Sequence, residues 1–221
     1  MTNVAHAFIL DMDGTMVDSM PAHAKSWDLF RRRHGVAMST EEILRRTTGR
    51  NGLECAREVL GPQVPEQRAW ELMAQKEADY REIFGREFRE VAGFTAFARQ
   101  ARERGLKLAV ATGGDRDNLH FVLQRLRLEV GAEVRGDMGL PGKPDPAIFL
   151  EAARRLGVAP AECIVFEDAP FGIEAAARAG MRAVAICTTH SARELAGAHV
   201  IAQAADFEEL TKKNFLESLH A

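Results

Sequence analysis

Short apolar runs recur along the chain, and most of them end at a polar residue or a glycine. The runs are four to six residues long, rich in valine and isoleucine, and mostly unbroken by polar residues. This pattern is typical of strands that are covered on both faces of a sheet. We therefore expect strands at residues 7–10, 106–111, 163–166, 182–186 and 198–202.

Between the expected strands, apolar residues recur at spacings of three and four. This period predicts helices at residues 94–104, 118–126, 147–156, 172–179 and 207–219. Strands that alternate with helices form right-handed βαβ units in a parallel sheet. The predicted fold class is therefore α/β, with a Rossmann-like parallel sheet core and helices on both of its faces.

The stretch from residue 21 to residue 90 departs from this alternation, because it has helical patterns and no strand-like run. Helices are expected at residues 22–34, 40–46, 53–60 and 66–84. About 70 residues of helix are too many for one crossover connection. We expect an inserted all-helical cap domain over residues 19–90, and an α/β catalytic core built from residues 1–18 and 91–221.

Composition and charge limit the partners that the chain can have. Among 221 residues, 29 Lys and Arg against 32 Asp and Glu leave a net charge of −3, which gives no electrostatic basis for binding nucleic acid or an anionic membrane. Cys55, Cys163 and Cys187 are isolated and odd in number, so a full disulfide framework is excluded. The first apolar run stops at Asp11 with no basic segment before it, unlike a secretory signal. We expect a cytoplasmic protein that is a monomer or a weak dimer.

Paired carboxylates follow two of the expected strands, at the edge where the ligand crevice of an open parallel sheet lies. Asp11 and Asp13 come directly after the first strand, and Gly14 permits a tight turn there. Glu167 and Asp168 follow the strand at 163–166 in the same way. Buried carboxylates repel each other unless a cation neutralises them, and a hard divalent cation such as Mg²⁺ suits these oxygen ligands. An ordinary acidic turn is the alternative for each pair.

Two further motifs have the chemistry to contact an anion. Thr112, Gly113 and Gly114 follow the strand at 106–111 and present a hydroxyl together with unobstructed backbone N–H groups. Lys143 lies in a stiff turn between a glycine and a proline, ahead of a helix. Taken alone, the first motif is equally consistent with a plain turn, and the second with a surface lysine.

Taken in chain order, these four motifs resemble those of the haloacid dehalogenase-like hydrolase superfamily. The resemblance extends over about residues 6–205, and the helical insert is similar to the smaller cap domain of that superfamily. The matching motifs are Asp11-x-Asp13-Gly14-Thr15, Thr112-Gly113, Lys143-Pro144, and Glu167-Asp168 followed by Gly172-Ile173-Glu174-Ala175-Ala176.

The resemblance implies phosphoryl transfer at the first acidic pair. Asp11 would be the nucleophile that forms an aspartyl-phosphate. Asp13 would be the general acid that protonates the leaving oxygen, and afterwards the general base that activates the acceptor. Members that release halide need no proton and lack an acid two residues after the nucleophile, so Asp13 argues against dehalogenation.

The resemblance also assigns residues to the phosphate and to a metal. Thr112, Gly113 and Gly114 would hold the phosphate oxygens, and Lys143 would offset the negative charge between Asp11 and the phosphoryl group. Mg²⁺ would be the cofactor. Its ligands would come from Asp168, Glu167, Asp11 and the main-chain carbonyl of Asp13.

The start of the helical insert is similar to that of β-phosphoglucomutase-like proteins. His23 stands where those proteins carry a histidine that couples cap closure to the acid–base aspartate. Thr48, Gly49 and Arg50 resemble the cap loop that contacts the far end of a sugar phosphate, with Arg50 as a second anion contact. The alternatives are a His23 satisfied by a local carbonyl and an Arg50 that is exposed in a surface loop.

Two departures from the mutase pattern favour hydrolysis over isomerisation. The stretch Thr112-Gly113-Gly114-Asp115-Arg116 replaces a Ser-x-x-Lys-Asn segment, and Thr15 replaces a small apolar residue. We therefore expect a Mg²⁺-dependent phosphatase whose substrate is a small phosphorylated metabolite, with sugar phosphates as the first class to test. The alternative is a β-phosphoglucomutase-like sugar phosphomutase that uses the same phosphoaspartate.

Overall fold

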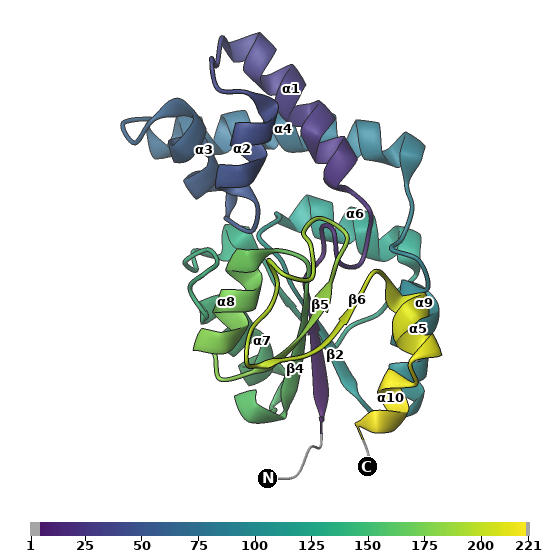
Figure 1. Ribbon diagram of the computed structural model, residues 1–221. Helices are drawn as coiled ribbons and strands as arrows, with labels where there is room; N and C mark the ends of the chain where they lie inside the picture. Colours follow the sequence, from purple (N-terminus) through teal and green to yellow (C-terminus); the bar gives the residue numbers. More distant parts are fainter. Residues whose placement is uncertain (1–4, 220–221) are drawn as a thin grey trace.

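The computed structural model describes residues 5–219, which form a six-stranded sheet with helices on both faces and four helices above one edge (Figure 1). The strand order is β3-β2-β1-β4-β5-β6, and every neighbouring pair is parallel. The α/β class with a parallel sheet is therefore confirmed. The strands are β1 Ala7–Leu10, β2 Lys107–Ala111, β3 Ala132–Val134, β4 Cys163–Glu167, β5 Arg182–Ile186 and β6 Val200–Ala204.

The central strand β1 is buried on both faces, as its unbroken apolar run predicts. Phe8 and Leu10 pack into one hydrophobic cluster, whereas Ala7 and Ile9 pack into another on the opposite face. This division follows from the two-residue period of a strand. The first cluster includes residues of α5 Phe94–Glu103, α6 Arg116–Leu126, α9 Phe207–Lys212 and α10 Phe215–Ser218, and the second includes residues of α7 Ala147–Leu156 and α8 Pro170–Arg178.

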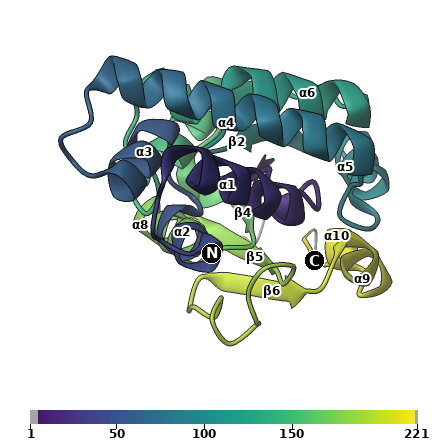
Figure 2. The same ribbon diagram turned by 90° about the horizontal axis from the view of Figure 1, so that it is seen from above.

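Four helices follow β1 and lie over the carboxyl edge of the sheet (Figures 1 and 2). They are α1 Met20–His34, α2 Thr40–Thr47, α3 Gly52–Leu60 and α4 Glu66–Glu87, and we call residues 20–87 the helical cap. Trp27, Phe30 and Ile43 belong to a hydrophobic cluster formed within this cap. The second half of α4 instead reaches the sheet, because Tyr80 and Phe84 belong to the cluster that contains Phe8 of β1.

The chain crosses between the core and the helical cap twice, and the two crossings lie side by side. The Val91 N–H donates to Met16 O at 3.0 Å, and the Asp18 N–H donates to Arg89 O at 3.2 Å. A short antiparallel bridge joins Val17 to Glu90 between these bonds. This pairing supports our proposal that the chain divides into a core of residues 1–18 with 91–221 and an inserted domain of residues 19–90.

Three elements differ from the sequence-based expectation. The strand β3 was missed because it has only three residues, with Glu133 in the middle. The strand expected at 198–202 begins at Val200 instead, because Val200 closes a turn by donating to Gly197 O. The helix expected at 207–219 breaks into α9 and α10, because Asn214 has a left-handed backbone with a φ of 53°.

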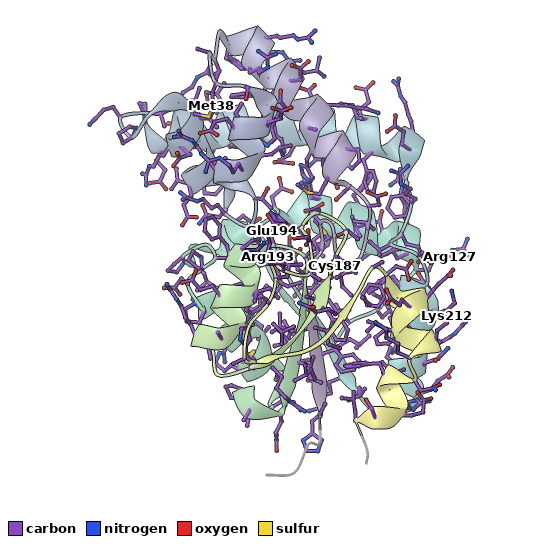
Figure 3. The ribbon with its side chains drawn as sticks, viewed as in Figure 1. Met38, Arg127, Cys187, Arg193, Glu194 and Lys212 are labelled. Atoms are coloured by element: carbon purple, nitrogen blue, oxygen red, sulfur yellow. The ribbon has the colours of Figure 1, made fainter. Side chains whose placement is uncertain are left out.

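The structure also bears on the cysteines and on membrane insertion. Cys55, Cys163 and Cys187 are all free thiols, so the prediction that they form no disulfide framework is confirmed. Cys187 directly follows β5, in the region where Figure 3 also labels Arg193 and Glu194. Within residues 5–219, no helix has both the length and the apolar character required to cross a bilayer.

The aromatic side chain of Phe166 on β4 offers a test of the core. Its ring centroid lies 4.8 Å from that of Phe8 and 5.7 Å from that of Phe97, and the side chain is fully buried. Replacing it by alanine leaves a cavity, so we expect Phe166→Ala to lower the free energy of unfolding by about 3–5 kcal/mol in urea titrations. Leu150→Ala is the control, since Leu150 is 39% exposed. An equal loss in both variants would contradict this account of the core.

Candidate active site

The turn after β1 places the first acidic pair at the carboxyl edge of the sheet. The Asp11 N–H continues the ladder to β4 by donating to Phe166 O at 3.0 Å, and the Gly14 N–H then donates to Val17 O at 2.8 Å. Gly14 has a φ of 84°, and a Cβ at this position would overlap the Asp168 carboxylate. Glycine is therefore required here both for the backbone conformation and for the close approach of Asp168.

Lys143 forms a buried ion triad with Asp11 and Glu167. Its Nζ lies 2.5 Å from Asp11 Oδ1 and 2.5 Å from Glu167 Oε1, and Lys143 is only 2% exposed. The alternative of a surface lysine is therefore wrong. Burial lowers the pKa of Lys143, but the charges of Asp11 and Glu167 outweigh it and raise that pKa above its usual value. The other oxygen of Glu167 accepts hydrogen bonds from the Asp168 and Ala169 N–H groups, both at 2.9 Å.

Asp11, Glu167 and Asp168 form a buried acidic cluster that has the ligands for a metal ion. One oxygen from each carboxylate lies within 4.8 Å of the others. Burial and the charge of Glu167 raise the pKa of Asp168 to about 7, and burial raises that of Asp11 despite the nearby lysine. Three carboxylates against one lysine leave negative charge that a hard divalent cation would neutralise. Thr15 and Thr189 orient Asp168 by donating hydrogen bonds to its carboxylate.

Asp13 is not part of this cluster and instead contacts the helical cap. Its Oδ1 accepts hydrogen bonds from Ser19 Oγ at 2.6 Å and from Tyr80 Oη at 3.1 Å, and lies 3.1 Å from His23 Nε2. Burial raises the pKa of Asp13, but the charge and hydrogen bond of His23, together with Ser19 and Tyr80, lower it to about 2. His23 therefore contacts the carboxylate of Asp13 directly, and its coupling of cap closure to this residue stays a prediction.

A second row of buried polar residues lies behind His23 and was not identified from the sequence. Lys76 Nζ lies 2.8 Å from His23 Nδ1 and donates to Glu77 Oε1 at 2.9 Å, while the Asn118 amide donates to Glu77 Oε2 at 2.7 Å. Lys76 is 2% exposed, and its ammonium lies 4.8 Å from the centroid of the Trp27 ring. Lys76 lies on the buried face of α4, at helical spacing from Leu72 and Tyr80, so its position in the apolar pattern was a signal of burial that the sequence analysis did not use.

A cavity of about 320 Å³ between the core and the helical cap brings the predicted site residues together. Lys143 does not line the cavity, because its side chain is buried and reaches the Asp11 carboxylate from inside the core. Much of the cap side of the cavity is apolar, with Leu44, Trp70 and Met73 among its lining residues. The predicted residues that line it are Asp11, Asp13, His23, Thr48, Gly49, Arg50, Thr112, Gly113, Gly114, Glu167 and Asp168.

Several of the residues predicted to bind the substrate already have hydrogen-bond or ion-pair partners within the protein. The Gly114 N–H donates to Thr112 Oγ1 at 3.0 Å, so the prediction that this N–H is unobstructed is wrong, and the Thr112 hydroxyl proton is directed elsewhere. The Thr48 hydroxyl donates to Leu44 O at 2.8 Å within its own helix turn. Arg50 NH1 lies 3.4 Å from Glu58 Oε2, so this guanidinium already has an acidic partner in the cap.

The buried ion triad leads to a prediction about stability. Replacing Lys143 by methionine leaves two buried carboxylates without their cation, so we expect Lys143→Met to lose about 3–5 kcal/mol of unfolding free energy in metal-free buffer. The loss should be larger at about pH 8 than at about pH 5, because buried carboxylates whose pKa is raised in the folded state bind protons as the pH falls.

The matched control is Lys25→Met, which removes an exposed ion pair with Glu87 in the helical cap. Its urea midpoint should stay close to that of the wild type, because exposed pairs contribute little. A Lys143→Met protein as stable as Lys25→Met at both pH values would contradict the role of the triad.

Comparison with known proteins agrees with this geometry. Residues 5–180 match the haloacid dehalogenase-like hydrolase family. Hexitol phosphatase A of Escherichia coli K12 is 30% identical over 185 residues, which cover 81% of this chain and 82% of the relative. Validoxylamine A 7′-phosphate phosphatase of Streptomyces hygroscopicus subsp. limoneus is 34% identical over 200 residues, covering 87% and 91% of the two chains.

Among solved structures, β-phosphoglucomutase of Clostridium difficile superposes with a TM-score of 0.84 over 98% of this chain and 97% of its own. At 20% identity this similarity concerns the fold alone. The family match extends from before β1 to the end of α8 and so includes all four motifs at the carboxyl edge of the sheet. The chain belongs to the haloacid dehalogenase-like hydrolase family.

Proposed function

We propose that this protein is a Mg²⁺-dependent phosphatase that hydrolyses a small phosphate monoester, with sugar and polyol phosphates as its substrate class. The observation that carries the proposal is the contact of Lys143 with Asp11, beside an acidic cluster whose carboxylates line the cavity between the core and the helical cap. The names of the two relatives described above, both phosphatases of carbohydrate-like phosphates, support the substrate class.

In the proposed reaction Asp11 attacks the phosphorus atom of the ester. The new bond joins an Asp11 carboxylate oxygen to phosphorus, and the bond between phosphorus and the ester oxygen breaks. Because a carboxylate and a phosphate dianion repel each other, the step requires nearby positive charge. Lys143 supplies it without moving, since its ammonium is already 2.5 Å from Asp11 Oδ1.

Asp13 would transfer the protons of the two half-reactions. It first gives a proton to the leaving oxygen, and then accepts one from the water that attacks the phosphoaspartate and releases inorganic phosphate. A pKa of about 2 suits the second role, because Asp13 is then ionised at neutral pH. For the first role, the pKa must rise when the substrate binds, and a phosphate dianion next to the carboxylate acts in that direction.

The acidic cluster fits Mg²⁺ as the cofactor. Asp11 and Asp168 would provide carboxylate ligands, with Glu167 and the main-chain carbonyl of Asp13 completing the predicted set. The ion supplies positive charge that stabilises the phosphoryl oxygens during transfer. Glu167 also positions Lys143 and the turn after β4, since one of its oxygens accepts a hydrogen bond from Lys143 and the other accepts from two backbone N–H groups.

A phosphomutase is the second candidate, and the contact of His23 with Asp13 is the observation that favours it. In that reaction a second sugar hydroxyl, rather than water, would accept the phosphoryl group from Asp11. The two candidates differ in their product, because the mutase converts β-glucose 1-phosphate to glucose 6-phosphate without net release of phosphate. A coupled assay for glucose 6-phosphate, run beside a phosphate assay, separates them.

The nucleophile is tested with p-nitrophenyl phosphate and a panel of sugar and polyol phosphates in the presence of Mg²⁺. We expect the wild type to release phosphate, and Asp11→Asn to lose at least about a thousandfold in rate because an amide cannot form the phosphoenzyme. Asp115→Asn is the control, since Asp115 also lines the cavity but is not in the acidic cluster. A wild type no more active than Asp11→Asn on every substrate would refute the proposal.

The metal requirement is tested by removing divalent cations with a chelator. We expect activity to fall at least about a hundredfold and to return when Mg²⁺ is added in excess. Mg²⁺ should also raise the melting temperature of the wild type, because a ligand that binds only the folded state stabilises it. In Asp168→Asn, Mg²⁺ should neither restore activity nor raise the melting temperature. Full activity in the chelated protein would exclude a role for the metal.

A further inference from the structure

The start of α3 in the helical cap is held against a core loop by two side chains. Glu54 Oε1 accepts a hydrogen bond from the Gly142 N–H at 3.0 Å, and the Asn51 amide donates to Leu140 O at 3.4 Å. Asn51 also caps α3, because its Oδ1 accepts from the Glu54 N–H at 3.0 Å. One short segment of the cap therefore contacts both ends of the loop 140–142.

Three glycines form the core surface under this segment, and the absence of a side chain at each of them allows the chain to pack closely. Gly113, Gly136 and Gly142 do not have a positive φ, so their backbone conformation does not require glycine. A Cβ at Gly113 would lie 2.6 Å from Arg50 O of the cap. One at Gly136 would first overlap Gly113 O of the core and would also lie 3.1 Å from Asn51 Cβ. A Cβ at Gly142 would overlap the Glu54 carboxylate. Any side chain at these positions would therefore disturb the contact between cap and core.

The Gly142 N–H, which donates this hydrogen bond to Glu54, belongs to the residue directly before Lys143 in the sequence. The ammonium of Lys143 contacts Asp11. The Asp145 N–H donates back to Gly142 O at 3.0 Å, so both backbone polar groups of Gly142 are engaged. An acceptor on the cap thus fixes the peptide that leads into Lys143, across 88 residues of sequence.

We propose that Glu54 is a positioning residue, which docks the helical cap on the glycine surface and holds the loop of Lys143 in place while the cap is closed. Glu54 acts through this loop and does not line the cavity. The inference rests on the proposed function, because its consequence is a slower phosphoryl transfer to Asp11. An acidic residue in the first turn of a helix also interacts with the helix dipole, so the experiment must separate the hydrogen bond from the charge.

The experiment uses Glu54→Ala, Glu54→Gln, Gly142→Ala and the double variant Gly142→Ala with Glu54→Ala. We expect kcat for p-nitrophenyl phosphate to fall about threefold to tenfold in Glu54→Ala, the size of one lost hydrogen bond, and Glu54→Gln to stay within about twofold of the wild type. Gly142→Ala should fall as far as Glu54→Ala. The double variant should fall no further, because both changes break the same contact.

Gly85→Ala is the control, since Gly85 lies in α4 of the cap and an added Cβ there meets the movable end of Arg125 at 3.3 Å and the Phe121 ring at an ordinary 3.8 Å. Its kcat should match that of the wild type. Additive losses in the double variant, or a wild-type kcat in Glu54→Ala, would overturn the proposal. A Glu54→Gln protein as slow as Glu54→Ala would also overturn it, since charge rather than the hydrogen bond would then matter.

Hydrogen–deuterium exchange over residues 136–146 gives a readout that does not depend on activity. We expect faster exchange in Glu54→Ala than in the wild type, because the Gly142 N–H loses its acceptor, and no change in Glu54→Gln. Unchanged exchange in Glu54→Ala would show that the contact is absent in solution, whatever the enzyme does. Faster exchange together with an inactive wild type would instead refute the proposed function and leave the docking contact standing.

Discussion

Burying negative charge costs free energy, and the whole site depends on Lys143, the lysine that offsets this cost. Its position constrains the path of the chain around it. Asp11 is 7% exposed, and Glu167 and Asp168 are each 1% exposed. Within one buried cluster these carboxylates repel each other and are poorly solvated. Lys143 brings one positive charge into contact with two of them. The loop before α7 must therefore reach the ends of β1 and β4, which lie side by side at the centre of the sheet.

The helical cap reaches this charged centre by two separate contacts. His23 and Tyr80 contact Asp13, which would transfer protons, whereas Glu54 contacts the backbone next to Lys143. The first contact lowers the pKa of Asp13, and the second holds the loop that leads into Lys143. A cap that moves away from the core would release both groups together, so its position is linked to the chemistry as well as to the exclusion of water.

The sequence predicted the parts of the fold and site that depend on local patterns. Unbroken apolar runs identified β1 and β4, and the polar residues that follow them include Asp11 and Asp168, which the structure brings together. The strand β3 was too short to give such a pattern. The spacing of apolar residues in α4 places Lys76 on its buried face, but it does not identify the contact of Lys76 with His23 across 53 residues. Glu54 gave no such signal, because its contact with Gly142 spans 88 residues that no local spacing encodes.

The cavity is chemically divided, and this division limits how the cap can select a substrate. The core side presents carboxylates and backbone groups, whereas the cap side combines apolar residues such as Trp70 and Met73 with the side chains of His23, Arg50 and Lys76. The Thr48 hydroxyl donates within its own helix turn and Lys76 contacts His23, whereas Arg50 has only a partly exposed pair with Glu58 at 3.4 Å. Buried polar groups with partners gain little from exchanging them for a substrate hydroxyl. In the proposed reaction the cap would therefore select a substrate by shape, by apolar contact and through Arg50, whose pair with Glu58 is weak enough to exchange.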